Sequence, residues 1–523
     1  MKSKARICIP VCVKNAAELA GAVKRAGEFG DVIEIRFDCL EPAEVVEALK
    51  RYGDFREAVL RPFIVTFRPA NQGGFRAIDE DERIQFWTEL AQLWLRSQSR
   101  DDLADIEAKL LFEEPAMGEL IDRLGADRVI CSHHDFSGIP KDLEHLYERM
   151  AATSVRVIKI ALQANDATDC ISIFKLLDRA QREGRDLIAI AMGQAGVMTR
   201  ILGPSRGSWL TYGSLDEDTA TAPGQLTARE LRELYRIDRI NQQTEITGLI
   251  GRPVSHSISP HIHNAANAQA NLNAVFVPFE VNDIDAFIRQ MARPHTREIE
   301  WNLRGLSVTA PHKSAVMGHL DWIEPAAKEI GAVNTIVVET GELHGYNTDA
   351  GGFITPLRSR IASLESLRCA VIGAGGAARA VVWALRNSGS EVTVFARDCD
   401  RAKAFSEQFR VACHDLAAAD FHGFDVVINA TPLGTRGEGE NETPAVAEQL
   451  RGVRLAYDLV YNPLETRFMG EARGAGCEII GGLEMLIAQA VEQFNLWTGK
   501  TPDIEAMRAA AERALKRSVH AHT

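Results

Sequence analysis

The sequence lacks long apolar runs, an excess of basic charge and grouped cysteines. No apolar run approaches the roughly 20 residues that cross a bilayer, so we expect no membrane span. The formal net charge of −13 argues against a nucleic acid or an anionic membrane as partner, because both bind basic surfaces. Nine cysteines lie dispersed without CxxC pairs or metal-like spacing. We therefore predict reduced core thiols in a cytoplasmic protein, with no disulfide framework and no metal.

The N-terminus, MKSKARICIPVCV, is basic and then apolar, as a signal peptide would be. Its apolar part is short and ends at Lys14, so we interpret it as a first β-strand. No long Ser/Arg-rich, acid-poor leader is apparent. Hydrophobic residues make up 46% and charged residues 25% of the 523 residues, which is typical of a packed enzyme with two or three domains.

The first half repeats one unit, a short apolar run followed by a polar helical stretch such as Glu82–Ser97. Runs rich in Ile and Val with little alternation are typical of parallel strands buried on both faces. Eight such units predict a (β/α)8 barrel. The runs are Arg6–Val13, Asp31–Asp38, Pro62–Arg68, Leu103–Ala108, Arg128–Asp135, Arg156–Ala161, Asp186–Met192 and Ser208–Ser214.

Ionisable residues stand at or just after the ends of these runs, where barrel enzymes build their active sites. They are Arg36, Arg68, Glu107, His134, Lys159 and Arg200. A charged residue after a strand is usually just the start of a loop. Lys159 differs because it lies inside the apolar run VIKIA, and burying a lysine without a purpose costs several kcal/mol.

The character of the chain changes after the polar segment Asp216–Leu226 and a helical segment, Thr227–Asn241. A new strand begins at Thr244–Ile250, so we place a domain boundary near residue 240. A second break falls near residues 350–368. The segment Arg368–Arg397 that follows has the order strand, glycine turn, helix, strand, which predicts a dinucleotide-binding βαβ unit.

The glycine turn VIGAGGAARA lets the backbone approach a pyrophosphate at a helix N-terminus. Its glycines are Gly373, Gly375 and Gly376. The next strand ends in Arg397, with Arg401 one helical turn further on. Arginine suits the 2′-phosphate of NADP, whereas the adjacent Asp398 would suit NAD. We favour NADP.

The second half resembles shikimate dehydrogenase over about residues 245–515. The motifs are GLIGRPVSHSISPHIHNAA, SVTAPHK, IGAVNT, GYNTDAGG, INATPLG, YDLVYNP and GGLEMLIAQA. The resemblance implies a catalytic pair, Lys313 and Asp349. It implies substrate contacts from Ser257, Ser259, Thr309, Asn334, Tyr461 and Gln489. It implies cofactor contacts from Ala377, Asn429 and Thr431, besides the glycines and arginines above.

The first half resembles type I 3-dehydroquinate dehydratase over about residues 5–235. The motifs are EIRFD, TFRPANQGG, DIE, SHHDF, VIKIA, MGQAGVMTR and TATAPGQL. The resemblance implies that Lys159 forms a Schiff base, that His134 is the general base, and that Glu107 orients His134. His133 is a less favoured base because strand alternation points it the other way. Substrate contacts would come from Glu34, Arg36, Arg68, Arg200, Thr221 and Gln225.

The order of the halves resembles the fused enzyme of plants and some bacteria. It implies dehydration of 3-dehydroquinate followed by NADPH-dependent reduction of 3-dehydroshikimate to shikimate, by a monomer or homodimer. The expected domains are a barrel at 1–240, a substrate-binding domain at 241–352 that helices at about 483–520 complete, and a Rossmann NADP-binding domain at 353–482.

Some positions depart from the two patterns without removing a nucleophile or a proton-transfer group. They are Gln72 for Glu, Thr221 for Ser, Ser307 for Asn and Thr435 for Met. Two alternatives remain: a dehydrogenase of mixed quinate and shikimate specificity, and a non-catalytic sensor of the quinate pathway. The lack of a basic DNA-binding segment and the retention of Lys159 and Lys313 disfavour the sensor.

Overall fold

The computed structural model describes residues 5–96, 101–437 and 439–520. The chain divides into two compact units. One extends to Thr244 and includes Val277–Met291 and Thr296–Asn302, and the other contains the remaining residues. Among the described residues, no helix is long and apolar enough to cross a membrane.

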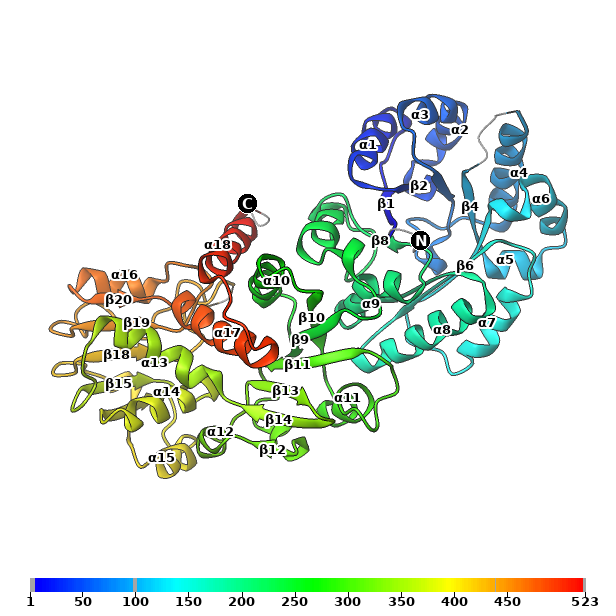
Figure 1. The fold of residues 1–523 in the computed structure, drawn as a ribbon. Coiled ribbons are helices and arrows are strands. Elements are labelled where there is room, and N and C mark those ends of the chain that lie inside the picture. The colour runs from blue at the N-terminus through cyan, green and yellow to red at the C-terminus, as the bar shows by residue number, and fades with distance from the viewer. Residues whose placement is uncertain (1–4, 97–100, 438, 521–523) are drawn as a thin grey trace. The chain divides into compact units, whose positions relative to one another are not determined.

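Eight parallel strands form a nearly closed barrel in the order β7-β6-β5-β4-β3-β2-β1-β8 (Figure 1). A parallel bridge between Leu187 and Ser208 joins the two edges. The strands are β1 Ile7–Val11, β2 Val32–Arg36, β3 Phe63–Thr66, β4 Leu103–Glu107, β5 Val129–Asp135, β6 Val157–Gln163, β7 Asp186–Met192 and β8 Thr211–Tyr212. The predicted (β/α)8 fold is confirmed.

Helices follow the strands as expected. They are α1 Ala16–Phe29, α2 Val45–Lys50, α3 Tyr52–Ala58, α4 Glu80–Arg96, α5 Ala108–Glu113, α6 Ala116–Leu124, α7 Leu143–Ala151, α8 Cys170–Glu183 and α9 Val197–Leu202. The predicted end of the fourth helix, Ser97, lies outside the described residues.

The barrel interior is layered, because every second side chain of a strand points inward. A lower layer is apolar and contains Val32, Ile64, Leu103, Ile130 and Val157. Two residues further along the same strands, the inward positions are polar: Glu34, Thr66, Asp105, Ser132 and Lys159. Arg36, Glu107 and His134 follow at the strand ends, and Arg68 lies just beyond β3. The predicted site residues of five strands therefore face one another.

Two local predictions were wrong. The last barrel strand is only Thr211–Tyr212, and the predicted helix Thr227–Asn241 is broken. It contains a π-helical turn at Glu230–Leu234, after which Arg236 takes a positive φ of 52°. Arg232 in the π-helical turn pairs with Asp31 and Asp238, so tertiary ion pairs favour the irregular path over a regular helix.

The prediction that all cysteines are reduced was also wrong. Cys12, just after β1, forms a disulfide with Cys39, just after β2. The other seven are free, and five of them are buried. Spacing along the chain does not reveal this pair, because the parallel pairing of β1 with β2 brings the two strand ends together.

Two six-stranded sheets follow the barrel along the chain. The first has the order β10-β9-β11-β13-β14-β12 and mixes parallel and antiparallel pairs. Its strands are β9 Glu245–Gly251, β10 Ala274–Glu280, β11 Asn302–Val308, β12 Trp322–Ile323, β13 Thr335–Glu339 and β14 Glu342–Tyr346. The second is parallel, in the order β17-β16-β15-β18-β19-β20. Its strands are β15 Arg368–Ile372, β16 Glu391–Ala396, β17 Ala412–Asp415, β18 Val426–Asn429, β19 Leu455–Asp458 and β20 Glu478–Ile480.

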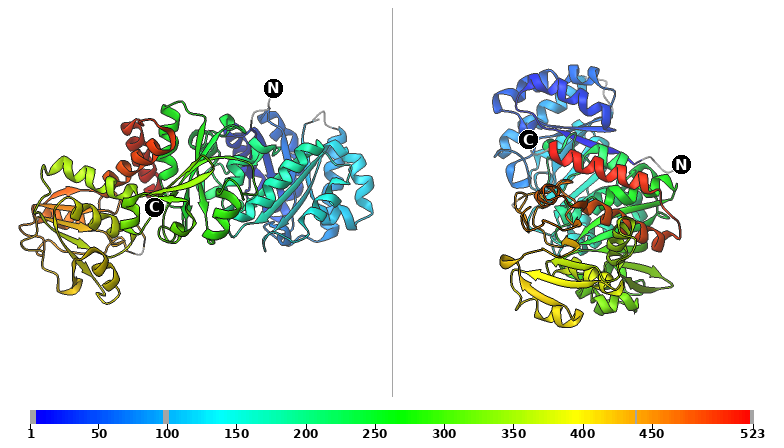
Figure 2. Two further views of the ribbon diagram at one scale, coloured as in Figure 1. Left: turned by 60° about the horizontal axis from the view of Figure 1, so that its bottom comes forward. Right: turned by 90° about the vertical axis from the view of Figure 1, so that its left-hand side faces the viewer.

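The helices of this half are α10 Ser259–Gln269, α11 Ile284–Phe287, α12 Pro325–Ile330, α13 Thr348–Arg360, α14 Gly376–Asn387, α15 Lys403–Phe409, α16 Arg467–Gly474, α17 Gly482–Thr498 and α18 Ile504–His520. The C-terminal α17 and α18 pack against α10 through an apolar cluster (Figure 2). Helix α13 spans residues 352 and 353, where a domain boundary was expected, so that the boundary falls inside a helix.

The close packing of α13 on α17 depends on Gly352. A Cβ there would lie 2.6 Å from the Gln489 Cβ and 2.9 Å from its backbone nitrogen. We expect Gly352→Ala to destabilise this helix pair by about 1–3 kcal/mol. Hydrogen exchange of α13 and α17 peptides measures the effect. The control is Gly470→Ala in α16, where a Cβ meets nothing within 4 Å; equal exchange in both variants would contradict the prediction.

Candidate active sites

Lys159 lies at the centre of the barrel, with only 4% of its surface exposed. Its Nζ is 2.7 Å from Asp105 Oδ2, 2.9 Å from the Tyr212 hydroxyl and 3.4 Å from Glu34 Oε1. Three acceptors match the three N–H donors of an ammonium group. The Tyr212 ring also lies against the amine, with its centroid 4.4 Å from Nζ. The lysine is therefore held in one place by groups from β2, β4 and β8.

Asp105 connects Lys159 to Arg68, whose Nη2 donates to the same carboxylate oxygen at 2.8 Å. Burial alone would raise the pKa of Asp105, but the positive charges of Arg68 and Lys159 outweigh it and hold that pKa well below its usual range. Sequence reasoning missed both Asp105 and Tyr212. The signal for Asp105 was present, because it is a second acid two residues before Glu107 in an otherwise apolar strand.

His134 lies beside this cation network. Burial, with the positive charges of Arg68 and Lys159, lowers its pKa well below the ordinary value, so its ring is neutral near pH 7. Its Nδ1 is buried and has no hydrogen-bond partner among the described residues. Its backbone N–H donates to Gln72 Oε1 at 3.3 Å. A neutral imidazole with a free nitrogen is suited to accept a proton.

Glu107 does not hold His134 in this structure. Both of its carboxylate oxygens are buried without a hydrogen-bond partner among the described residues, and Arg83 is 3.7 Å away. Burial raises the pKa of Glu107 to about 7. The described residues therefore do not form the expected contact between Glu107 and His134, and the orienting role of Glu107 stays a prediction.

The barrel arginines differ in their partners. Arg36 pairs with Asp38, and Arg68 with Asp105. Arg200 is 2% exposed, and within the described part of the chain it has no carboxylate partner. Its Nη2 donates to the Pro223 carbonyl at 3.3 Å, and burial lowers its pKa to about 10.

The loop around Pro223 also carries Thr221 and Gln225, and the Thr221 N–H donates to Gln225 Oε1 at 2.8 Å. Two further predicted substrate contacts, Thr221 and Gln225, thus lie on the loop that Arg200 contacts. Among the described residues, several buried polar atoms of the barrel also lack partners, which leaves them free to bind a polar ligand. They are Asp105 Oδ1, Arg68 Nε, His134 Nδ1 and Arg200 Nε.

In the second half, Lys313 and Asp349 form the expected pair, with Nζ 2.5 Å from Oδ2. The other carboxylate oxygen accepts from Asn334 Nδ2 at 2.8 Å. Asp349 lies in the first turn of α13, where the helix dipole favours a negative charge. Three of the predicted residues therefore form one hydrogen-bonded group.

The predicted carboxylate-binding serines are also adjacent. The Ser257 hydroxyl donates to Ser259 Oγ at 3.1 Å, and Ser259 begins α10. The Thr309 N–H donates to the Ile250 carbonyl at 2.9 Å, which joins the ends of β9 and β11. Gly251 permits this approach, because a Cβ there would lie 2.3 Å from the Thr309 Cγ2.

Gln489 and Tyr461 contact residues outside the Lys313–Asp349–Asn334 group. The Gln489 amide donates to the Leu486 carbonyl of its own helix at 2.9 Å, and Tyr461 packs on the α10–α17 cluster. Within the described part of the chain, neither forms a hydrogen bond with Lys313 or Asp349. Their roles stay predictions.

The glycine turn fits a dinucleotide. Gly373 has φ 111°, and a Cβ there would lie 3.0 Å from the Ala430 carbonyl oxygen. Gly375 precedes α14 and offers no side-chain cap, so the free N–H groups of the helix remain for phosphate. A Cβ on Gly376 would lie 3.9 Å from Lys313 Cδ, which brings this turn next to the lysine.

Some residues around the turn form hydrogen bonds or ion pairs with other side chains, and Arg397 is exposed. Asn429 is buried, accepts from the Thr431 hydroxyl at 2.6 Å and donates to Asp458, so it shapes the loop. Arg401 pairs with Asp398 at 3.3 Å, whereas Arg397 is exposed. Because Asp398 is paired with Arg401 and Arg397 is exposed, this strand end fits a 2′-phosphate better than a ribose diol. No group of metal-binding side chains occurs among the described residues.

Family models match along most of the chain. Residues 7–242 match type I 3-dehydroquinase. Residues 249–336 match the shikimate dehydrogenase substrate binding domain, 357–437 match shikimate/quinate 5-dehydrogenase, and 482–512 match the shikimate 5′-dehydrogenase C-terminal domain.

Known proteins match the second half and the whole chain. A shikimate dehydrogenase (NADP(+)) of Carboxydothermus hydrogenoformans is 38% identical over 52% of this chain and 98% of its own length. A crystal structure of shikimate dehydrogenase in complex with NADP+ is 37% identical, with a TM-score of 0.49, over 53% of this chain and 97% of that one.

The fold and sites define a fused lyase and dehydrogenase. The bifunctional 3-dehydroquinate dehydratase/shikimate dehydrogenase, chloroplastic, of Arabidopsis thaliana is 34% identical over 95% of this chain and 83% of its own length. The chain therefore belongs to the bifunctional 3-dehydroquinate dehydratase/shikimate dehydrogenase family.

Glu107 predicts a pH dependence of stability. Its folded pKa of about 7 lies above its ordinary value of 4.5, so the stability it contributes is complete below pH 4.5 and is lost as pH rises to about 7. We expect Glu107→Gln to match the wild type at pH 4 and to be more stable by up to about 3 kcal/mol at pH 8. Urea unfolding measures this. The exposed Glu113→Gln is the control, and a pH-independent difference would contradict the prediction.

Proposed function

We propose that the barrel dehydrates 3-dehydroquinate through Lys159 and that the second half reduces the resulting 3-dehydroshikimate to shikimate with NADPH. The observation that carries the proposal is the buried Lys159, held by Asp105, Tyr212 and Glu34 in a barrel of this family. Arg200, without a carboxylate partner in the described residues, receives the substrate carboxylate.

The deprotonated Lys159 amine attacks the C3 ketone, and loss of water gives an iminium that acidifies the C2 proton. His134 takes that proton, because its ring is neutral and its Nδ1 is free. The imidazolium then protonates the departing C1 hydroxyl. Hydrolysis of the imine frees Lys159. Glu34, Arg36, Arg68, Thr221 and Gln225 bind the remaining substrate groups.

In the second half, Lys313 is placed to donate a proton to the oxygen of the C3 ketone as negative charge develops on it. Asp349 and Asn334 fix the lysine and bind the neighbouring hydroxyl. Ser257, Ser259 and Thr309 bind the carboxylate, which favours shikimate over quinate, and Tyr461 and Gln489 complete the substrate site.

When bound, NADPH supplies the hydride. Gly373, Gly375, Gly376 and Ala377 at the α14 N-terminus would hold its phosphates. Arg397 and Arg401 would hold the 2′-phosphate. Asn429 and Thr431 shape the loop on the nicotinamide side.

The functional domains are a dehydratase barrel at 1–240, a substrate-binding lobe at 241–352 with helices at about 483–520, and an NADP-binding lobe at 353–482. Seven free cysteines, beside the Cys12–Cys39 disulfide, support a cytoplasmic location. A monomer or homodimer suffices, since each half carries its own set of proposed groups.

Two lysine variants separate the activities. We expect Lys159→Ala to oxidise NADPH with 3-dehydroshikimate but not with 3-dehydroquinate. We expect Lys313→Ala to dehydrate 3-dehydroquinate while NADPH oxidation falls by about 10²-fold or more. Absorbance of NADPH and of the enone product reports both. Exposed Lys141→Ala and Lys328→Ala are the controls; NADPH oxidation from 3-dehydroquinate by Lys159→Ala would contradict the assignment.

Arg397 predicts cofactor choice. Arg397→Ser removes a charged donor to the 2′-phosphate, so we expect the KM for NADPH to rise about tenfold or more, with the KM for NADH unchanged. Initial rates at varied cofactor measure this, with the exposed Arg451→Ser as control. An equal rise in both KM values would show that Arg397 does not read the phosphate.

A further inference from the structure

We propose that the Cys12–Cys39 disulfide positions Arg36 through Asp38, and that its reduction weakens substrate binding in the dehydratase half alone. The inference rests on the proposed function of the barrel. The disulfide is half-buried and lies just after β1 and β2, on the side of the barrel where the proposed site residues lie.

Asp38 immediately precedes Cys39 in the tight turn Phe37–Cys39. Its two carboxylate oxygens accept from Nε and Nη2 of Arg36 at 2.9 and 2.7 Å. Both side chains are almost fully buried, so a bidentate pair leaves Arg36 little freedom. The position of a proposed substrate contact therefore follows the position of this turn.

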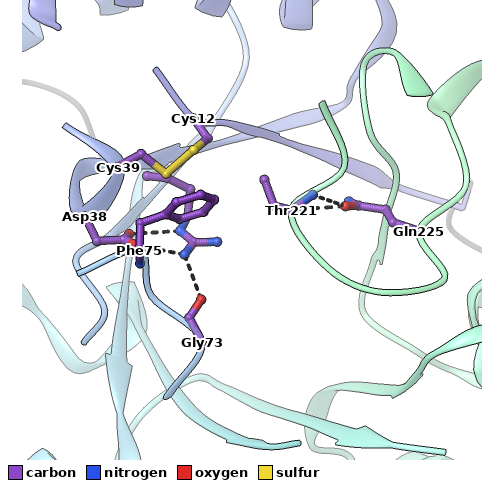
Figure 3. The surroundings of a disulfide bond; sticks show 8 residues. Cys12, Asp38, Cys39, Gly73, Phe75, Thr221 and Gln225 are labelled. Atoms are coloured by element: carbon purple, nitrogen blue, oxygen red, sulfur yellow. Dashed lines mark hydrogen bonds and ion pairs between the residues drawn. A yellow bond between two sulfur atoms is a disulfide. The ribbon is translucent and has the colours of Figure 1, made fainter. Parts of the chain in front are cut away.

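The same turn also fixes the loop after β3. Asp38 Oδ2 accepts from the Phe75 N–H at 3.2 Å, and Arg36 Nη2 donates to the Gly73 carbonyl at 3.2 Å. Figure 3 shows Asp38 and Phe75 near the disulfide, Gly73 below them, and Thr221 and Gln225 on another loop to the right. The loop after β3 carries Gln72, which accepts from the His134 backbone. The disulfide is thus connected to both the binding and the base residues.

The pair is accessible to a thiol reagent. Cys12 and Cys39 are half-buried, whereas five of the seven free cysteines are buried. Strand pairing between β1 and β2 does not involve the sulfurs, so the barrel persists without the bond. Reduction therefore relaxes the turn without unfolding the barrel, and substrate affinity changes more than turnover.

The redox step requires a dithiol reductant. One of its thiolates attacks a sulfur of the disulfide, breaking the S–S bond and forming a mixed disulfide. Its second thiolate then displaces the remaining cysteine. The protein gains two thiols, and the reductant becomes a disulfide. Dithiothreitol serves as the reductant in vitro.

The test uses the full chain, assayed oxidised and after dithiothreitol. We expect reduction to raise the wild-type KM for 3-dehydroquinate about fivefold or more, with kcat changed less than about twofold. Cys12→Ser/Cys39→Ser should show the raised KM in both states. Asp38→Asn should raise KM without any change in the thiols. Dehydrogenase rates in the same samples, and Cys399→Ser in the other half, are the controls.

An identical KM in the oxidised and reduced wild type would overturn the inference. Alkylation of Cys12 and Cys39 in the unreduced protein, detected by peptide mass spectrometry, would also overturn it. Loss of dehydratase activity in both states, with the dehydrogenase intact, would instead overturn the proposed barrel function and this inference with it.

Discussion

A buried ion network inside the barrel is the constraint on which the first half depends. Lys159, Asp105, Arg68 and Glu34 carry charges, and each is at most 4% exposed. Charges so far from water persist only when they are paired and hydrogen-bonded. Parallel strands in register place these residues on facing positions above an apolar layer, which supports them and excludes water. The closed barrel therefore makes the network possible, and the network gives the lysine one fixed position.

The second half also contains a lysine–aspartate ion pair, at a less buried site. Lys313 is 21% and Asp349 10% exposed, and their contact is fixed by the end of β11 and the start of α13. Glycines allow close packing here, because Thr309 packs against the backbone of Gly251 and Gln489 against that of Gly352. Gly376 in turn brings the dinucleotide turn against Lys313. Close backbone packing, more than charge burial, holds this site together.

The apolar runs predicted the barrel strands, and Lys159 inside VIKIA was a local signal of a functional residue. The resemblance to the two families supplied most other candidate residues, whose roles stay predictions. Contacts between residues of different strands could not be predicted from the sequence. The Cys12–Cys39 bond depends on the pairing of β1 with β2, and the contact of Tyr212 with Lys159 depends on barrel closure. The expected Glu107–His134 contact likewise depends on side-chain positions that the local sequence does not show, and the described residues do not form it.

The central claim is that the buried Lys159 is the nucleophile of the dehydratase half. The most direct measurement is borohydride reduction of the wild-type chain during turnover of 3-dehydroquinate, followed by peptide mass spectrometry. A Schiff base on Lys159 would be reduced to a stable amine and would add the substrate-derived mass to the peptide that contains it. The account predicts that mass on the Lys159 peptide alone. An unmodified Lys159 peptide during active turnover, or the adduct on another lysine, would contradict it.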